Sequence, residues 1–91
     1  MQTARGLALS ILGEIFQDGA FSNIALKKSL GKATLSEVDK SLVTEIVYGT
    51  VSRKLTLEWY LSHFVADRDQ VDPWIYHLLL MSLYQFVYLE K

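Results

Sequence analysis

The sequence predicts an all-α fold, an antiparallel bundle of about five helices. Three observations lead to this prediction. Apolar residues recur at spacings of three and four along nearly the whole of the 91-residue chain, which is the helical period. Residues typical of helix ends separate the periodic segments. With 51% hydrophobic residues, the chain has enough apolar material for one compact core and no room for a separate catalytic module.

The first two helices are predicted from their caps and their apolar stripes. Thr3 is suited to cap the first helix, and the Asp18-Gly19 turn signal ends it. Between them runs one apolar stripe, Ala4, Leu7, Ala8, Ile11, Leu12 and Ile15. Ser22 is suited to cap a second, shorter helix, and Gly31 to the left-handed position after its end.

The third helix is predicted to start at Ser36, because an acid three residues later, Asp39, forms a pattern similar to a capping box. Its inner face is expected to hold Val38, Leu42, Val43, Ile46, Val47 and Thr50. Gly49 falls within that stripe. A missing side chain there permits a crossing helix to approach closely.

A fourth helix is predicted to be capped by Thr56, with an inward face made of Leu57, Tyr60, Leu61 and Phe64. The polar stretch 67–70 then reads as a connector. Asp72-Pro73 restarts a helix, since the acid can cap it and proline at the first helical position loses no needed hydrogen bond.

The last segment, Trp74 to Leu89, has apolar or aromatic residues at thirteen of its sixteen positions. A helix that is hydrophobic on every side belongs in the centre of a bundle, and four short helices can hardly surround it. We therefore expect residues 1–91 to be one domain of a longer protein whose further helices cover this segment. The alternative is that it docks on another domain or pairs with a second copy.

Several function classes find no support in the sequence. The chain has no cysteine, which excludes disulfides, thiolate metal sites and cysteine nucleophiles. His63 and His77 fall on different predicted helices without clustered carboxylates, and no glycine-rich phosphate loop occurs. We expect no catalytic residue, metal or bound cofactor in this chain. No leader pattern or membrane-length apolar run is seen, so a cytoplasmic protein without membrane contact is expected.

The charge is unevenly placed along a chain whose net charge is −1. The middle third is basic between two acidic ends, and a basic region can meet phosphate. The candidate RNA-binding residues are Arg5, Lys27, Lys28, Lys40, Arg53 and Lys54. For Arg5, the partner is either phosphate or a carboxylate such as Glu45. The aromatic residues are expected to be mostly core or interface anchors, namely Trp59, Trp74, Tyr76, Tyr84, Phe86 and Tyr88.

The order and spacing of several segments resemble a known family. The matching residues are Arg5 with Ala8 and Leu12, residues 21–26, residues 45–53, Asp72-Pro73-Trp74 and Tyr84-Gln85. Together they are similar to the N-terminal, NusB-like domain of the bacterial ribosomal RNA cytosine-5 methyltransferases called Sun, Fmu or RsmB. The Val-Tyr-Gly…Arg and Asp-Pro-Trp…Tyr-Gln segments are the most specific parts of this resemblance.

The resemblance implies a NusB-like fold with more helices after Lys91, followed by a methyltransferase domain that binds S-adenosylmethionine and carries catalytic cysteines. This chain would then be a non-catalytic accessory domain that holds 16S ribosomal RNA for that missing domain. Arg5 and Arg53 match basic positions of the family, and Lys40 stands where arginine is common.

Two positions depart from the family pattern. The last helix commonly carries arginines where this chain has Tyr76 and Leu80. If those arginines touch RNA in relatives, the contact has moved elsewhere here. If they only pair with carboxylates, the substitution changes packing alone. Apart from RNA binding, the sequence leaves open a protein-interaction role, in which Trp74 to Leu89 docks on the methyltransferase domain or forms a homodimer.

Overall fold

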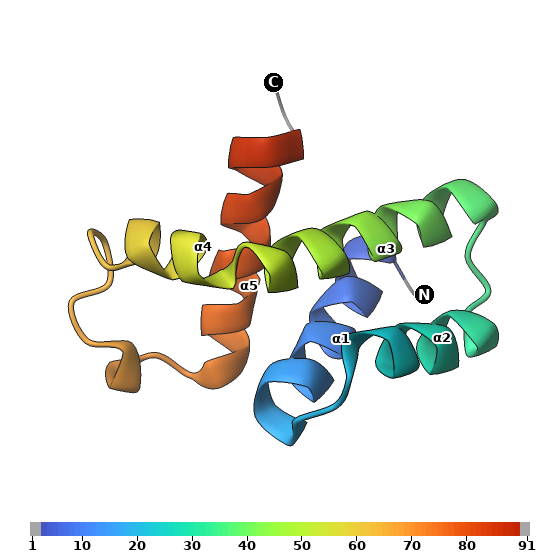
Figure 1. Cartoon of the computed structure of the whole chain (residues 1–91), viewed down its shortest axis with the longest axis horizontal. Coiled ribbons are helices and arrows are strands. Elements are labelled where there is room, and N and C mark those ends of the chain that lie inside the picture. Colours follow the sequence, from blue (N-terminus) through green and yellow to red (C-terminus); the bar gives the residue numbers. More distant parts are fainter. Residues whose placement is uncertain (1–2, 90–91) are drawn as a thin grey trace.

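The computed structural model describes residues 3–89, in which short loops and turns connect helices. Its helices are α1 (Ala4–Asp18), α2 (Ser22–Lys32), α3 (Glu37–Ser52), α4 (Lys54–Leu61) and α5 (Pro73–Tyr84). A 3-10 turn, Arg68–Gln70, precedes α5, and a π-helical turn, Gln85–Leu89, continues it. No strand occurs among the described residues, which confirms the predicted all-α fold. α2 and α3 lie side by side and antiparallel in front of α1, and α5 crosses behind α3 (Figure 1).

Both predicted ends of α1 are confirmed. The Thr3 hydroxyl accepts a hydrogen bond from the Gly6 N–H at 3.0 Å, and Gly19 takes the left-handed conformation with φ 74°. The predicted stripe is buried as far as Leu12, and Ile15 is half-buried against the same core. α1 therefore forms the centre of the α1–α2–α3 half of the molecule.

The predicted caps of α2 are wrong at both ends. Ser22 is already helical, and the extended Phe21 precedes it, with its carbonyl accepting from the Ala25 N–H at 2.9 Å. At the other end the helix runs through Gly31 to Lys32. It ends at an extended Ala33, so no left-handed residue is needed. Backbone hydrogen bonds alone thus start and stop this helix.

α3 begins as predicted, because the Ser36 hydroxyl accepts from the Asp39 N–H at 3.2 Å. The inner face holds Val43, Ile46, Val47 and Thr50, all buried, with Leu42 half-buried. Val38 is 79% exposed, so its predicted inward position is wrong. The first turn of α3 lies at the edge of the molecule in Figure 1, beside the end of α2.

Gly49 marks the crossing of α3 and α5, as predicted. A Cβ atom built on Gly49 would overlap the ring of Tyr84. The Tyr84 ring is buried there, and its hydroxyl donates to the Glu45 carboxylate at 3.2 Å, one turn earlier on α3. The missing side chain therefore lets α5 place a tyrosine directly on the α3 backbone.

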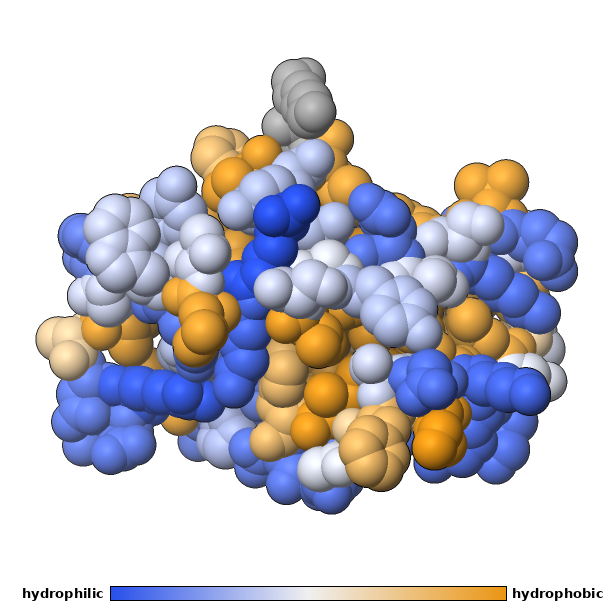
Figure 2. Space-filling view, viewed as in Figure 1, coloured by the Kyte–Doolittle hydropathy of each residue, from blue (hydrophilic) through white to orange (hydrophobic). Residues whose placement is uncertain are grey.

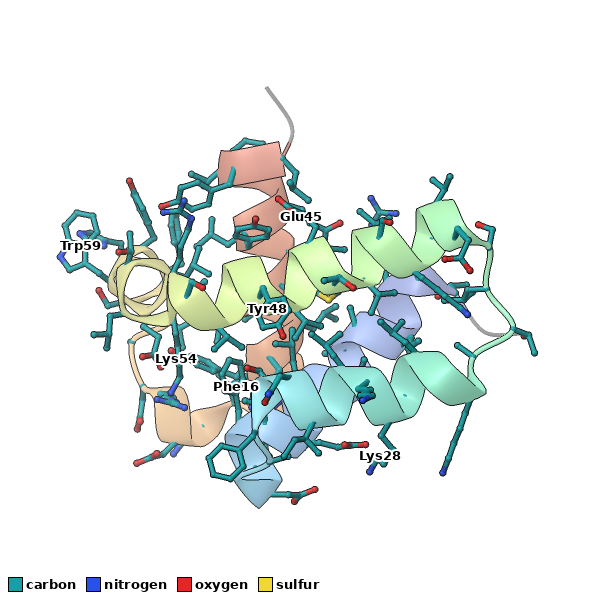
Figure 3. The ribbon with its side chains drawn as sticks, turned by 45° about the vertical axis from the view of Figure 1, so that its right-hand side comes forward. Phe16, Lys28, Glu45, Tyr48, Lys54 and Trp59 are labelled. Atoms are coloured by element: carbon teal, nitrogen blue, oxygen red, sulfur yellow. The ribbon has the colours of Figure 1, made fainter. Side chains whose placement is uncertain are left out.

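A single residue, Arg53, joins α3 to α4. Its N–H donates to the Gly49 carbonyl at 3.1 Å, and its carbonyl accepts from the Leu57 N–H at 2.9 Å. α4 consequently starts at Lys54, and the prediction that Thr56 caps it is wrong, since Thr56 lies inside the helix. The chain bends at Arg53, so that α4 is seen end-on in Figure 3 while α3 runs across the view.

α4 buries a narrower face than predicted. Leu57 and Leu61 are buried against α5. Tyr60 and Phe64 were predicted to face inward but are 39% and 80% exposed. The helix ends at Leu61, so Phe64 lies in the turn beyond it, and Tyr60 stands at the edge of the Leu57–Leu61 stripe.

α5 starts at Pro73 as predicted, although the Asp72 side chain makes no cap hydrogen bond. One flank of the segment 74–89 is buried through Tyr76, His77, Leu80, Met81, Tyr84 and Gln85. Leu78, Leu79 and Leu83 on the other side are half-buried, while Trp74 at the start of the segment and Phe86 in its last turn are 58% and 72% exposed. Apolar side chains also gather around the upper end of this helix in Figure 2. The sequence predicts that this segment is covered on every side, and residues 3–89 do not cover it completely.

The buried residues form two clusters. The larger one joins α1, α2 and α3 and includes Met81 of α5. The smaller one joins α4 and α5 through Leu57, Leu61, Tyr76, Leu80 and Tyr84. Phe16 packs against both clusters and so lies at their junction. Over residues 3–89, no helix has the length and apolarity that crossing a membrane requires.

Candidate nucleic-acid interface

Arg53 and Lys54, at the junction of α3 and α4, hold their charges against aromatic rings. The Arg53 guanidinium lies 4.2 Å from the centroid of the Tyr88 ring, and the Lys54 Nζ lies 5.1 Å from that of Phe16. Within residues 3–89 neither cation has an ion-pair partner. A ring face restrains a cation without neutralising it. Both charges therefore remain available to an anion.

The two neighbouring side chains diverge. Arg53 reaches Tyr88 in the last turn of the chain's final helical segment, whereas Lys54 reaches Phe16, whose ring contacts that of His77 at 5.3 Å. Eleven residues separate His77 from Tyr88, about 16 Å along the helix. Figure 3 shows Lys54 and Phe16 together beneath α3. Arg53 and Lys54 thus present charge on two sides of the α3–α4 junction.

Three other predicted residues already have partners. Lys28 pairs with Glu14 at 3.5 Å, and Lys40 pairs with Glu37 at 3.9 Å. The Arg5 Nε donates to the Gln85 Oε1 at 2.6 Å. Glu45, the carboxylate predicted as a partner for Arg5, instead accepts from Tyr84. α1 packs against α5, which brings Gln85 rather than Glu45 to Arg5.

The six candidate residues do not form one cluster. Lys40 lies near the start of α3 and Arg53 just after its end, about 20 Å apart along the axis. Lys27 and Lys28 lie midway along the antiparallel α2, where both side chains are exposed. The structure therefore spreads these charges over α1, α2 and α3, and even the sequence neighbours Arg53 and Lys54 point to different sides of the α3–α4 junction.

His77 is buried and packs against Phe16, which lies at the junction of the two core clusters. Burial lowers its pKa below the usual 6.5, and the nearby charges of Arg68 and Lys54 lower it further. Its ring packs against Phe16 in a tilted arrangement. No cluster of three metal-binding side chains occurs within residues 3–89. His77 is therefore a packing residue.

We expect the protein to lose stability on mild acidification because of His77. Since the folded pKa lies below 6.5, the unfolded chain takes up the proton first, and the free energy of unfolding falls as the pH drops below 6.5. Denaturant unfolding at several pH values between about 7 and 5.5 measures this slope. His77→Gln should flatten it. An unchanged slope in that variant would assign the loss to other groups.

Comparison with known proteins identifies the family to which this chain belongs. The sequence pattern of the NusB family matches residues 2–91, which is almost the entire chain. The chain belongs to the NusB family. This NusB-family chain is 40% identical over 89 residues to the probable ribosomal RNA small subunit methyltransferase B of Bacillus subtilis (strain 168), covering 98% of this chain and 20% of the relative.

A second relative of this NusB-family chain is the protein of the same name from Synechocystis sp. (strain ATCC 27184 / PCC 6803 / Kazusa). It is 33% identical over 93 residues, covering 100% of this chain and 21% of the relative. The chain thus spans about a fifth of the length of these relatives. No solved structure matches it.

The two positions that depart from the family's arginine pattern both face inward in this structure. Leu80 has no exposed surface, and Tyr76 is 5% exposed. The Tyr76 hydroxyl donates to the Glu58 carboxylate at 3.1 Å, which also accepts from Arg68 at 2.8 Å. Burial and the hydrogen bond to Glu58 raise the pKa of Tyr76. Position 76 therefore faces a carboxylate that would pair with an arginine, which favours a change of packing over a lost RNA contact.

The sequence reasoning missed two features of this surface. Tyr88 was expected in the core or an interface. Its ring contacts the Arg53 guanidinium in a cation–π arrangement and stacks on Tyr84, with ring centroids 5.4 Å apart. Trp59, expected likewise, is 60% exposed. The exposure of Trp59 could have been predicted from its spacing. Leu57 and Leu61 define the buried face of α4, and Trp59, midway between them in sequence, falls on the opposite face.

Proposed function

We propose that this chain is the RNA-binding domain of a ribosomal RNA small subunit methyltransferase and that it binds small-subunit ribosomal RNA through phosphate contacts. The observation that carries the proposal is the pair Arg53 and Lys54, whose charges are held on aromatic rings and have no ion-pair partner within the described residues. Phosphate contacts fix position and orientation without reading sequence. The names of both relatives support ribosomal RNA as the substrate.

The proposed mechanism is positioning. The rest of the protein would carry out S-adenosylmethionine-dependent methylation of cytosine at C5 in the cytoplasm, and this domain would hold the RNA while that reaction proceeds. Lys27, Lys28, Lys40 and Arg5 are proposed as further contacts. Lys28 and Lys40 would exchange Glu14 and Glu37 for phosphate, which costs little because exposed ion pairs contribute about 0–1 kcal/mol.

Exposed apolar side chains on the last helical segment favour a second candidate function. Trp74 at its start and Phe86 in its last turn are exposed, and a shallow depression of about 350 Å³ lies between Arg5, Leu78 and Phe86. An apolar helix face of this kind fits a protein partner, either the methyltransferase domain or a second copy of this chain. The two candidate surfaces share Arg5, which lines this depression and is also proposed as an RNA contact.

Charge removal tests the proposed RNA contacts. Arg53→Gln and Lys54→Gln should each weaken binding to fragments of small-subunit ribosomal RNA and reduce the slope of log affinity against log salt by about one. Fluorescence anisotropy at several salt concentrations measures both quantities. Lys28→Gln and Lys40→Gln, at the further contacts, should have smaller effects because their charges are already paired.

Two outcomes would contradict the proposals. Unchanged RNA affinity after joint replacement of Lys27, Lys28, Arg53 and Lys54 refutes the residue assignment. Light scattering on the same samples checks the second candidate. A dimer that ignores RNA would favour the docking function over RNA binding.

A further inference from the structure

Four ring-bearing side chains gather on the outer face and the end of α4. They are Trp59, Tyr60, His63 and Phe64, called here the α4 aromatic cluster. Trp59 and Phe64 are 60% and 80% exposed, and Figure 3 shows Trp59 projecting away from the rest of the molecule. Leu57 and Leu61 on the opposite face already anchor α4. The cluster therefore adds little to the core and leaves much aromatic surface in water.

The rings of the cluster are arranged as the walls of a notch. The centroid of Trp59 lies 5.1 Å from that of Tyr60 and 4.7 Å from that of His63, with interplanar angles of 72° and 70°. A ring nitrogen of His63 is hydrogen-bonded to the Trp59 carbonyl at 3.0 Å, which fixes that ring. The four residues alone line an open depression of about 300 Å³. Rings that meet edge to face leave aromatic faces free for a further flat group.

The charges near the cluster favour a nucleic-acid strand as the partner. Arg53 lies at the start of the same helix, seven residues before Tyr60, a distance of about 10 Å along the axis. Glu58, the carboxylate on α4, is engaged by Arg68 at 2.8 Å and Tyr76 at 3.1 Å and is mostly buried. Arg53, which has no ion-pair partner within residues 3–89, thus lies directly before α4. The stacking surfaces follow two turns later, on the order of one or two nucleotides of an extended strand away.

We propose that the α4 aromatic cluster is a stacking site for an unpaired base of single-stranded RNA, with the adjoining phosphate held at Arg53. This inference rests on the proposed function, because it assigns a base contact to the same RNA. Stacking on a ring face tolerates any base, so the site selects unpaired strand over duplex rather than a particular sequence. Together with the phosphate contacts, this site would make the protein bind RNA loops or single strands more tightly than duplex RNA.

The experiment compares two single-stranded 12-nucleotide RNAs, one of cytidines and one with the same backbone but no bases. The full chain carries Trp74→Phe, so that fluorescence reports Trp59 alone. We expect the cytidine RNA to quench Trp59 and Trp59→Ala to weaken its binding about 5- to 150-fold, the range for one stacked base. We expect Trp59→Ala to leave the salt slope and the binding of the baseless RNA unchanged. Trp59→Phe should retain most of the affinity.

Each alternative outcome overturns the stacking site and says whether RNA binding survives. If Arg53→Gln weakens binding but Trp59→Ala does not, the stacking site is wrong and the phosphate contacts stand. If Trp59→Ala weakens both RNAs equally, its effect does not come from a base, and the stacking site is again wrong. If neither RNA binds the parent chain, both proposals fail. If Trp59→Ala instead dissociates a dimer without changing RNA affinity, the cluster is a protein interface. Because Trp59 is mostly exposed, an unchanged melting temperature is the control for folding.

Discussion

Replacing Gly49 by alanine is expected to lower the free energy of unfolding by about 1–3 kcal/mol, although alanine normally favours a helix. The new Cβ would overlap the buried Tyr84 ring, and that ring is held in place by its hydrogen bond to Glu45. Either α5 moves away from α3 or the ring leaves its site, and both lose packing. Denaturant unfolding measures the change.

Two further variants make this prediction specific. Gly13→Ala lies in the middle of α1 with no atom near its Cβ position, so it should gain about 0.5–1 kcal/mol from helix propensity alone. In a Tyr84→Leu background, Gly49→Ala should cost much less, because the shorter side chain leaves room for a methyl group. Equal costs in both backgrounds would show that the crossing of α3 and α5 is not the cause.

Leu80→Ala is expected to cost about 2–5 kcal/mol of stability. Leu80 has no exposed surface and packs between α4 and α5 in the smaller core cluster, so truncation leaves a cavity that the surrounding helices can only partly fill. The same chemical change at Leu55, which is 83% exposed, should alter stability by less than about 0.5 kcal/mol. Chemical denaturation of the pair gives both values. Similar losses at the two sites would contradict the packing described for α5.

Local signals in the sequence were enough to predict most of the fold. Thr3, Gly19 and Ser36 work at helix ends through their own side chains or backbone freedom, so residue type reveals them. Gly49 could be predicted because a glycine within an apolar stripe implies close approach. The caps expected at Ser22, Gly31 and Thr56 failed because backbone hydrogen bonds make those ends, and residue type carries no sign of them.

The candidate site was harder to predict because charge and exposure depend on contacts between helices. The six basic positions were found by composition and resemblance, but nothing in the sequence shows that Phe16 and Tyr88 lie under Lys54 and Arg53. The partner of Arg5 depends on how α1 packs against α5, which a pattern along one helix cannot report. Tyr60 and Phe64 were expected to face inward because aromatic residues are usually at least partly buried.

The junction between α3 and α4 consists of one residue, Arg53, and the number of residues there determines how α4 is rotated about its axis. Each residue added to a helix turns everything after it by about 100°. An insertion or deletion beside Arg53 would rotate Leu57 and Leu61 out of contact with α5 and carry Trp59 toward the interior. The rotation of α4 about its axis relative to α3, and with it the exposure of Trp59, is therefore set by the number of residues at this junction.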